Sequence, residues 1–326
     1  MRVFITGGTG FVGSRVVELL SDTPHEISCL VRDPTKAQAA RDAGADIIVG
    51  DLTDKASLLE GMRGCDWVAS IANLLEFWVP DRSVYKKVNV DGTRNVLEAA
   101  LETGISKVVH VSTVAVYGDA EWPISEDSAP GPKVVGEYMC SKRAGDDVAW
   151  ELYKTRRLPL VMVYPGGVIG PHDPKAAGRY IRDVVNGVMP AQVVTRSVFP
   201  WVHVRDVASG IVKALEKDGN IGERYFLVAE NLTFGEINRT LAEISGVRLP
   251  RLTMPDWMAV FSARCATAIA DLSKRPPMLN LAADQIRLMK QGFEADGSKA
   301  TRELGLEYTP IRAAFEEAVR SPSVSA

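Results

Sequence analysis

The sequence predicts an α/β fold: a doubly wound parallel sheet with a smaller, mainly helical lobe toward the C-terminus. Short apolar runs alternate with segments of helical apolar spacing through the first half of the chain, and a glycine-rich turn separates the first run from the first helix. Strands that alternate with helices form βαβ units, whose right-handed crossovers build a parallel sheet covered on both faces. Prolines and glycines punctuate the second half, which indicates loops and a separate lobe.

The expected elements follow from apolar periodicity. Strands are predicted, in chain order, over 3–5, 26–31, 46–49, 67–71, 107–111, 160–164 and 226–229. Helices are predicted over about 13–20, 90–103, 141–152 and 204–217, and the chain from 231 onward is expected to be mainly helical and broken by prolines. These elements assign 1–165 and about 202–229 to a Rossmann-type domain, and about 166–201 and 230–320 to a substrate-binding lobe. The tail 321–326 is expected to be disordered.

Composition narrows the class of partner. A net charge of -3 over 326 residues offers no basic field for nucleic acid and no polybasic patch for a membrane, so small molecules are the expected partners. The four cysteines show no C-x-x-C spacing, which indicates reduced thiols, no metal site and a cytoplasmic setting. The apolar stretch 257–272 contains charges and is too short to span a bilayer; it is expected to be a buried or substrate-facing helix.

The glycine-rich turn predicts a dinucleotide site. Its sequence, Thr6-Gly7-Gly8-Thr9-Gly10-Phe11-Val12-Gly13, joins the first strand to the first helix. Glycines in this position permit a tight turn and close backbone approach to a pyrophosphate, which the helix N-terminus stabilises.

The end of the second strand indicates which dinucleotide is preferred. Arg32 directly follows the strand, and Lys36 lies one helical turn further on. A guanidinium fork suits the 2′-phosphate of NADP(H). NAD(H) is the less favoured alternative. Asp33 supports it, because an acidic residue in this region accepts hydrogen bonds from ribose hydroxyls.

Tyr138 and Lys142 form the candidate proton-transfer pair. Four residues apart, they share one face of a helix. A tyrosine hydroxyl with a pKa of about 10 is a poor acid or base at neutral pH. A neighbouring ammonium is expected to lower that pKa into a useful range.

These motifs, in this order, resemble those of the extended short-chain dehydrogenases/reductases over nearly the whole chain. The matching segments are the glycine turn, Asp51-Leu52, Asn89–Val96, His110–Gly118, Tyr138–Lys142, Tyr164–Pro171 and Val202–Ala208. Within the family, the sequences around Arg32 and Lys299–Leu306 look most like the dihydroflavonol-reductase-like and steroid-dehydrogenase-like branch.

The resemblance implies residue roles. Tyr138 would exchange a proton with the substrate oxygen, Thr113 would hydrogen-bond that oxygen, and Lys142 would hold the nicotinamide ribose. Ser112, beside Thr113, is the alternative hydroxyl. The other residues implied are Asn89 in the catalytic site and, for the cofactor, Asp51, Leu52, Ala72, Pro165 and Val168, in addition to Thr6, Gly7, Gly10, Phe11, Val12 and Gly13.

Departures from the family pattern favour one reaction. Val114 and Ala115 stand where sugar-nucleotide dehydratases carry an acidic pair, and Tyr164 stands where sugar-nucleotide enzymes commonly have arginine. The expected activity is therefore NADP(H)-dependent reduction of a small, fairly apolar aldehyde or ketone. Aromatic and apolar lobe residues suit such a pocket, although each also suits a core: Phe199, Trp201, Met254, Trp257 and Phe261.

Two other functions remain open. One is a nucleotide-sugar epimerase that retains NAD; the other is a non-catalytic NADP-sensing protein on the same scaffold. A homodimer formed through the helices that begin near Val90 and Ser141 is implied by the resemblance. His172-Asp173 is expected to be polar surface rather than a metal pair, and His110 a core histidine.

Overall fold

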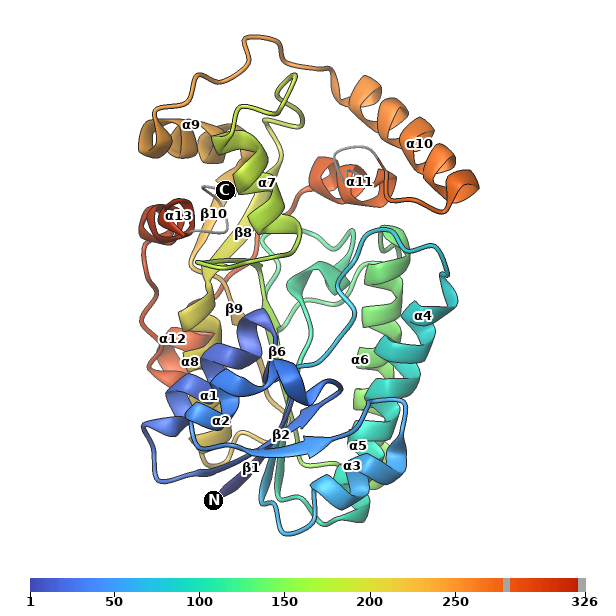
Figure 1. Ribbon diagram of the computed structural model, residues 1–326, viewed down its shortest axis with the longest axis vertical. Helices are drawn as coiled ribbons and strands as arrows, with labels where there is room; N and C mark the ends of the chain where they lie inside the picture. The colour runs from blue at the N-terminus through green and yellow to red at the C-terminus, as the bar shows by residue number, and fades with distance from the viewer. Residues whose placement is uncertain (278–281, 322–326) are drawn as a thin grey trace.

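The computed structural model describes residues 1–277 and 282–321, arranged as a large and a small sheet with their helices (Figure 1). The tail expected to be disordered lies outside the described residues, apart from Ser321, whose hydroxyl accepts a hydrogen bond from the His172 backbone. Within the described ranges, no helix combines the length and apolar character needed to cross a bilayer.

The large sheet has seven parallel strands, which confirms the predicted fold class. In spatial order they are β3 (Asp46–Val49), β2 (Glu26–Val31), β1 (Arg2–Thr6), β4 (Trp67–Ser70), β5 (Lys107–Val111), β6 (Leu160–Pro165) and β9 (Arg224–Leu227). Within β1, Phe4 packs into one core while Val3 and Ile5 pack into the other, and all three are fully buried. Burial on both faces explains the continuous apolar runs of the sequence.

Helices cover both faces of this sheet (Figure 1). One face carries α3 (Lys55–Gly61), α5 (Thr93–Glu102) and α6 (Gly136–Arg156). The other carries α1 (Phe11–Ser21), α8 (Val204–Glu216) and the late α12 (Ser298–Leu304), which packs on α8 and β9. The short elements between them are η1 (Pro34–Lys36), α2 (Gln38–Asp42), α4 (Ser83–Tyr85), the π-helix η2 (Lys86–Gly92) and η3 (Val114–Tyr117).

The small sheet is a feature that the sequence analysis did not predict. Its order is β10 (Glu230–Thr233), β8 (Val198–His203) and β7 (Gly167–Ile169), with β10 antiparallel and β7 parallel to β8. Glycine and proline made these segments look like loops. Pro200 is tolerated inside β8 because the ladder with β7 begins one residue later, at Trp201.

The remaining helices surround the small sheet and complete the lobe. They are α7 (Ala176–Val185), α9 (Phe234–Ser245), α10 (Asp256–Ser273), α11 (Ala283–Gln291) and α13 (Ile311–Arg320). In Figure 1 this lobe lies above the large sheet, with α10 at its outer right edge.

Helix α10 corrects one prediction. A helix was expected over 257–272, and α10 is that helix, but most of its large apolar side chains are exposed; Val260 packs against the lobe core. Trp257 is 68% exposed, Phe261 62% and Leu272 88%, whereas the buried positions of α10 are alanines.

Candidate active site

The glycine turn is built for close approach of a ligand. Gly7 has a φ of 80°, in the left-handed region where only glycine is unstrained, and a Cβ at Gly13 would collide with the Gly7 carbonyl oxygen. The Thr6 hydroxyl accepts hydrogen bonds from the backbone N–H groups of Ile71 and Ala72, at 3.1 and 3.2 Å, and so fixes the turn against the end of β4.

The first turn of α1 fits a pyrophosphate. No side chain caps this helix, whose N-cap residue is Gly10 and whose first residues are Phe11 and Val12. The first N–H groups of a helix have no partner within the helix, and together with the helix dipole they attract phosphate. The turn and helix therefore define a dinucleotide-binding α/β protein.

Asp33 and Arg32, the two residues expected near the adenosine ribose, differ in their contacts. Asp33 caps η1: its carboxylate accepts hydrogen bonds from the backbone N–H and the hydroxyl of Thr35, and Lys36 lies 3.8 Å away. These Thr35 hydrogen bonds lower the pKa of Asp33. Arg32 is exposed and forms no ion pair with the described residues.

The predicted adenine-side residues lie at the adjoining strand ends. Burial opposes ionisation of Asp51, but hydrogen bonds from Thr53 and the charge of Arg32 hold its pKa below the usual value. Leu52 is buried in the core, and Ala72 is half-buried against Gly7. Pro165 ends β6, and Val168 lies half-buried in β7.

The residues predicted to act in proton transfer lie on the segment that follows β5 and on the first half of α6, which contacts the end of β5 through Lys142. Tyr138 and Lys142 are 5% and 2% exposed. The Lys142 ammonium donates to the Val111 carbonyl at 3.0 Å. Thr113, half-buried, follows β5 and is the N-cap residue of η3.

Asn89 joins this group through a π-helical turn. Its amide oxygen accepts a hydrogen bond from the Leu74 N–H at 2.8 Å, and its amide nitrogen donates to the Ser141 hydroxyl at 2.9 Å. Ser141 in turn donates to the Tyr138 carbonyl. π-helical turns are rare and frequent at functional sites, and here η2 directs the Asn89 amide between α6 and the loop after β4.

The structure separates Ser112 from Thr113. Ser112 is buried and its hydroxyl donates to the Asp146 carboxylate at 2.8 Å. The Thr113 hydroxyl accepts one 3.4 Å bond from the Ala115 N–H and keeps its proton free to donate. This difference favours Thr113 as the hydroxyl that meets a substrate.

Asp146 was missed in the sequence analysis. It lies one turn beyond Lys142, so Tyr138, Lys142 and Asp146 form an i, i+4, i+8 stripe, which is the signal that identifies it. Burial raises its pKa to about 7, against the opposing effects of Lys142 and Ser112. One of its carboxylate oxygens, Oδ1, has no hydrogen-bond partner among the described residues.

The expected effect of Lys142 on Tyr138 is not present in this arrangement. Burial raises the pKa of Tyr138, and Asp146 and Tyr85 raise it further. Burial also lowers the pKa of Lys142. Lys142 is not among the groups that shift the pKa of Tyr138, because desolvation by burial is the dominant influence on both side chains.

A cavity lies beside Phe77, on the lobe side of Tyr138. It measures about 250 Å³ and is lined by Phe77 and Trp78 of the loop after β4, with Arg179, Pro276, Pro277 and Gln285. The Phe77 ring packs edge-to-face on the Tyr138 ring, with centroids 5.9 Å apart. An apolar run after β4, at the carboxyl edge of the sheet where ligands bind, is the sequence signal for Phe77 and Trp78.

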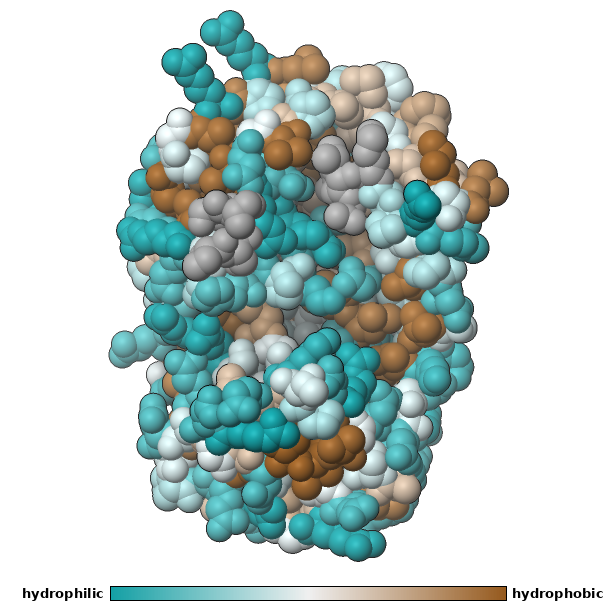
Figure 2. All heavy atoms as spheres, in the orientation of Figure 1, coloured by the Kyte–Doolittle hydropathy of each residue, from teal (hydrophilic) through white to brown (hydrophobic). Residues whose placement is uncertain are grey.

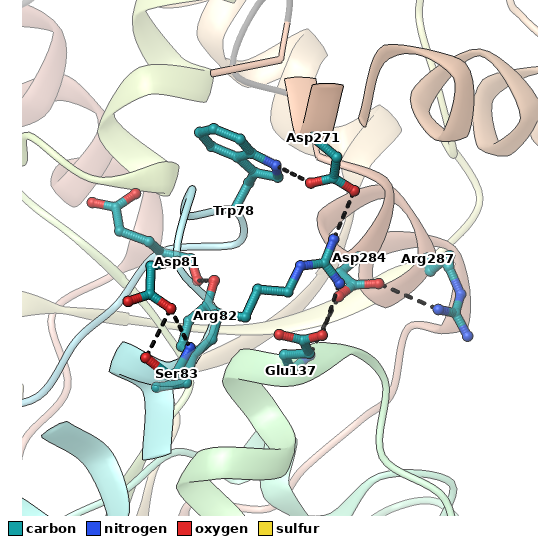
Figure 3. A network of polar contacts seen from close by, with 10 residues as sticks. Trp78, Asp81, Arg82, Ser83, Glu137, Asp271, Asp284 and Arg287 are labelled. Carbon is teal, nitrogen blue, oxygen red and sulfur yellow. Dashed lines mark hydrogen bonds and ion pairs between the residues drawn. The ribbon is translucent and has the colours of Figure 1, made fainter. Parts of the chain in front are cut away.

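Charged contacts lie around a second, smaller cavity, which shares Phe77 and Trp78 with the first (Figure 3). Arg82 binds Glu137 at 2.8 Å and Asp271 at 2.9 Å, and the Trp78 indole N–H donates to Asp271 at 2.8 Å. Glu137 directly precedes Tyr138, so these contacts join the end of α10 to the start of α6.

Several predicted lobe and polar residues lie elsewhere. Phe199 packs on Trp201 and Phe293 within the aromatic core of the small sheet, and the half-buried Met254 packs against the lobe core, so none of these lines the cavity. Asp173, expected on the surface, is buried and accepts hydrogen bonds from the N–H groups of Lys175 and Gly178. His110 is a buried core residue that contacts Ser70, as predicted.

Known proteins share this architecture. A profile of the NAD dependent epimerase/dehydratase family matches residues 3–227. A dihydroflavonol 4-reductase-like protein of Synechocystis sp. is 33% identical over 97% of this chain and 93% of its own. A 4-hydroxy-2-methyl-3-oxo-4-farnesyl-3,4-dihydroquinoline-1-oxide ketoreductase of Stigmatella aurantiaca is 28% identical over 94% and 91%. The crystal structure of gox2253 superposes with a TM-score of 0.83, at 32% identity over 97% and 96%.

The chain therefore belongs to the NAD dependent epimerase/dehydratase family and has the architecture of the extended short-chain dehydrogenases/reductases. This family uses nicotinamide cofactors, and the reductases among the relatives support an oxidoreductase.

Proposed function

We propose that the protein is an NADP(H)-dependent reductase of a fairly apolar aldehyde or ketone. The observation that carries the proposal is the placement of Tyr138: it is buried on α6 one turn before Lys142, and its ring packs on Phe77, a residue of the cavity wall. A protonated phenol is the form needed to donate to the oxygen of a carbonyl under reduction.

Each residue of the group has a role in this reaction. The Thr113 hydroxyl donates to the substrate oxygen and stabilises the negative charge that develops there. Tyr138 gives that oxygen its proton. The nicotinamide supplies the hydride when bound. Lys142 holds the ribose, and Asn89 orients the start of α6 through Ser141 and the Tyr138 carbonyl.

The surroundings of Thr113 support reduction over sugar dehydration. Val114 and Ala115, which follow it, are 1% and 3% exposed, so no acid or base stands beside the Thr113 hydroxyl on η3. The ketoreductase relative acts, by its name, on a ketone that carries a farnesyl group. Phe77, Trp78 and the two prolines of the cavity suit an apolar substrate of this kind.

The preference for NADP(H) is inferred from the segment after β2. The Asp33 carboxylate is engaged by Thr35 and Lys36, which leaves it poorly placed to accept from a ribose hydroxyl. Arg32 is exposed beside Asp51 and available to pair with a 2′-phosphate.

The test is turnover of NADPH and NADH with a panel of aliphatic and aromatic aldehydes and ketones. We expect NADPH oxidation with apolar carbonyls, and Arg32→Ser should raise KM for NADPH by roughly 10- to 100-fold with a much smaller effect on NADH. Arg63→Ser, an exposed arginine after α3, is the matched control. Tightly held NAD in the purified protein would instead indicate an epimerase. Nucleotide binding without turnover of any carbonyl would indicate a sensor.

A further inference from the structure

Helix α10 presents an apolar face to solvent. Trp257, Phe261, Ile269 and Leu272 are 68%, 62%, 65% and 88% exposed, and Leu252 in the preceding segment is 63% exposed. Their spacing of three, four and eight residues puts the four helical positions on one side of α10. The other side carries Ala259, Ala263 and Ala270, which are buried where α10 packs on α11.

Large side chains thus face outward on α10 and small ones face inward. Figure 2 shows hydrophobic side chains along the outer edge of the lobe, where α10 lies. Single exposed apolar residues are ordinary, but a group of five on one helix and its leading segment marks an interaction surface.

Unpaired cations accompany this face. Arg248 and Arg251 precede α10, Arg264 lies within it, and Lys274 and Arg275 follow it. All five are exposed, and none forms an ion pair with another described residue. The acidic residues of α10 are the exposed Asp256 and the half-buried Asp271, which pairs with Arg82. The segment 248–275 therefore combines an apolar helix face with an excess of positive charge.

The charges near α10 help to decide whether its apolar face binds a second copy of this chain or a lipid surface. In a two-fold dimer the same patch meets itself. An antiparallel pair of α10 helices would place Arg251 near Lys274 and Arg275 of the other copy, and a parallel pair would place each cation near its own equivalent. The segment 248–275 carries five cations and two carboxylates, so either orientation brings an excess of positive charge together. An anionic lipid surface satisfies both the cations and the apolar side chains.

We propose that α10 and the segment 248–255 dock on an anionic lipid bilayer, with Trp257, Phe261 and Leu272 inserted at the boundary between headgroups and acyl chains. With 18 residues, α10 is about 27 Å long and lies along the surface rather than across it. This proposal departs from the expectation of no membrane partner, which rested on the net charge of the whole chain.

The docking face lies close to the cavities that would receive a substrate. Thr267 of α10 lines the smaller cavity beside Arg82, and Pro276 and Pro277, just after α10, line the larger one. An apolar substrate dissolved in the bilayer would enter the cavity without crossing water. This delivery step rests on the proposed reductase function, whereas the docking itself does not.

The experiment is co-sedimentation of the full chain with vesicles of phosphatidylcholine, with and without phosphatidylglycerol. We expect binding to the phosphatidylglycerol vesicles that weakens as salt is added. The double variant Trp257→Ser/Phe261→Ser should reduce the partition coefficient by at least roughly tenfold, since two apolar side chains no longer insert. Arg264→Gln/Arg275→Gln should reduce it by roughly fivefold per cation on these vesicles and little on neutral ones.

Val49→Ser, a 62% exposed apolar residue on β3 at the far edge of the large sheet, is the matched control and should bind like the unaltered chain. Circular dichroism melting checks that each variant is folded.

The proposal is overturned if the unaltered chain does not sediment with anionic vesicles, or if the Trp257/Phe261 variant sediments equally well. Self-association that depends on Trp257 and Phe261, without vesicle binding, would assign the face to a second copy. NADPH turnover of a water-soluble carbonyl should be unchanged in the Trp257/Phe261 variant, so loss of docking is distinguishable from failure of the proposed reaction.

Discussion

Helix α6 places Tyr138, Lys142 and Asp146 inside the protein, whereas helix α10 places Trp257, Phe261 and Leu272 at its surface. Polar side chains are ordinarily exposed and apolar ones buried. Helix α6 buries polar side chains, and helix α10 exposes apolar ones. Buried ionisable groups are costly and need partners, and α6 provides some through the Val111 carbonyl and Ser112. Sequences depart from local rules chiefly at functional sites, and these two departures coincide with the two places where we propose that ligands bind.

The largest expected effect lies on α6. Tyr138→Phe removes the hydroxyl and keeps the ring that packs on Phe77. We expect the rate of carbonyl reduction to fall by roughly 10²- to 10⁴-fold, the usual contribution of a general acid, while NADPH affinity changes little. Single-turnover kinetics and fluorescence titration measure the two quantities. Near-normal turnover would show that α6 buries this residue for packing alone.

Asp146→Asn tests the cost of burying charge on α6. Because the folded pKa, about 7, lies above the ordinary value of 3.8, the contribution of Asp146 to stability is fully present below about pH 4 and is lost as the pH rises through 7. The variant should therefore gain unfolding free energy relative to the unaltered chain between pH 4 and 8, by roughly 1 to 4 kcal/mol. Urea denaturation across this range measures it. Parallel curves for the two chains would mean that Asp146 ionises as easily folded as unfolded.

The two faces of α10 should respond oppositely to substitution. Ala263→Leu adds volume on the packed side, where Ala263 is 4% exposed, and should lower the unfolding free energy by roughly 1 to 3 kcal/mol. Phe261→Ser on the exposed side should change it by less than roughly 0.5 kcal/mol. Thermal denaturation of both variants provides the comparison. A large loss in Phe261→Ser would show that this side chain is packed in solution.

The smallest effect concerns the contacts that join the two helices. Arg82→Gln removes the ion pairs to Glu137 at the start of α6 and to Asp271 near the end of α10 (Figure 3). Since the Arg82 side chain is 49% exposed, each pair should contribute no more than roughly 1 kcal/mol, less at high salt. Denaturation at low and high salt measures this, with Arg15→Gln, which breaks the Arg15–Glu18 pair within α1, as control. If Arg82→Gln lowers the unfolding free energy equally at low and high salt, the ion pairs are shielded from solvent.

The first half of the fold was predictable because its signals are local. Parallel strands buried on both faces read as consecutive apolar residues, and the predicted strand 107–111 matches β5 to the residue. The small sheet was missed because β7 has three residues and β8 contains Pro200, so neither shows strand periodicity. The outward face of α10 was missed because both sides of the helix are apolar, and hydropathy does not distinguish alanine packed inside from tryptophan outside.

The features of the candidate site also differ in how far the local sequence predicts them. Tyr138 and Lys142 were identified by spacing along one helix, and the structure shows them buried together. The choice of Thr113 over Ser112 depends on where two neighbouring hydroxyls point, which only tertiary contacts reveal. The effect of burial on the pKa of Tyr138 depends on the depth of the site, a property that no local pattern records.

The π-helical turn η2 has a consequence for how this chain tolerates changes in length. A π-turn corresponds to one extra residue in an otherwise regular helix, so removing a single residue from Lys86–Gly92 would restore ordinary α-helical bonding through α4, η2 and α5. The backbone would gain regularity, but everything before the deletion would rotate by about 100° about the helix axis. The Asn89 amide would lose Leu74 or Ser141. The irregular turn is thus the arrangement that lets one side chain link α6 to the loop after β4.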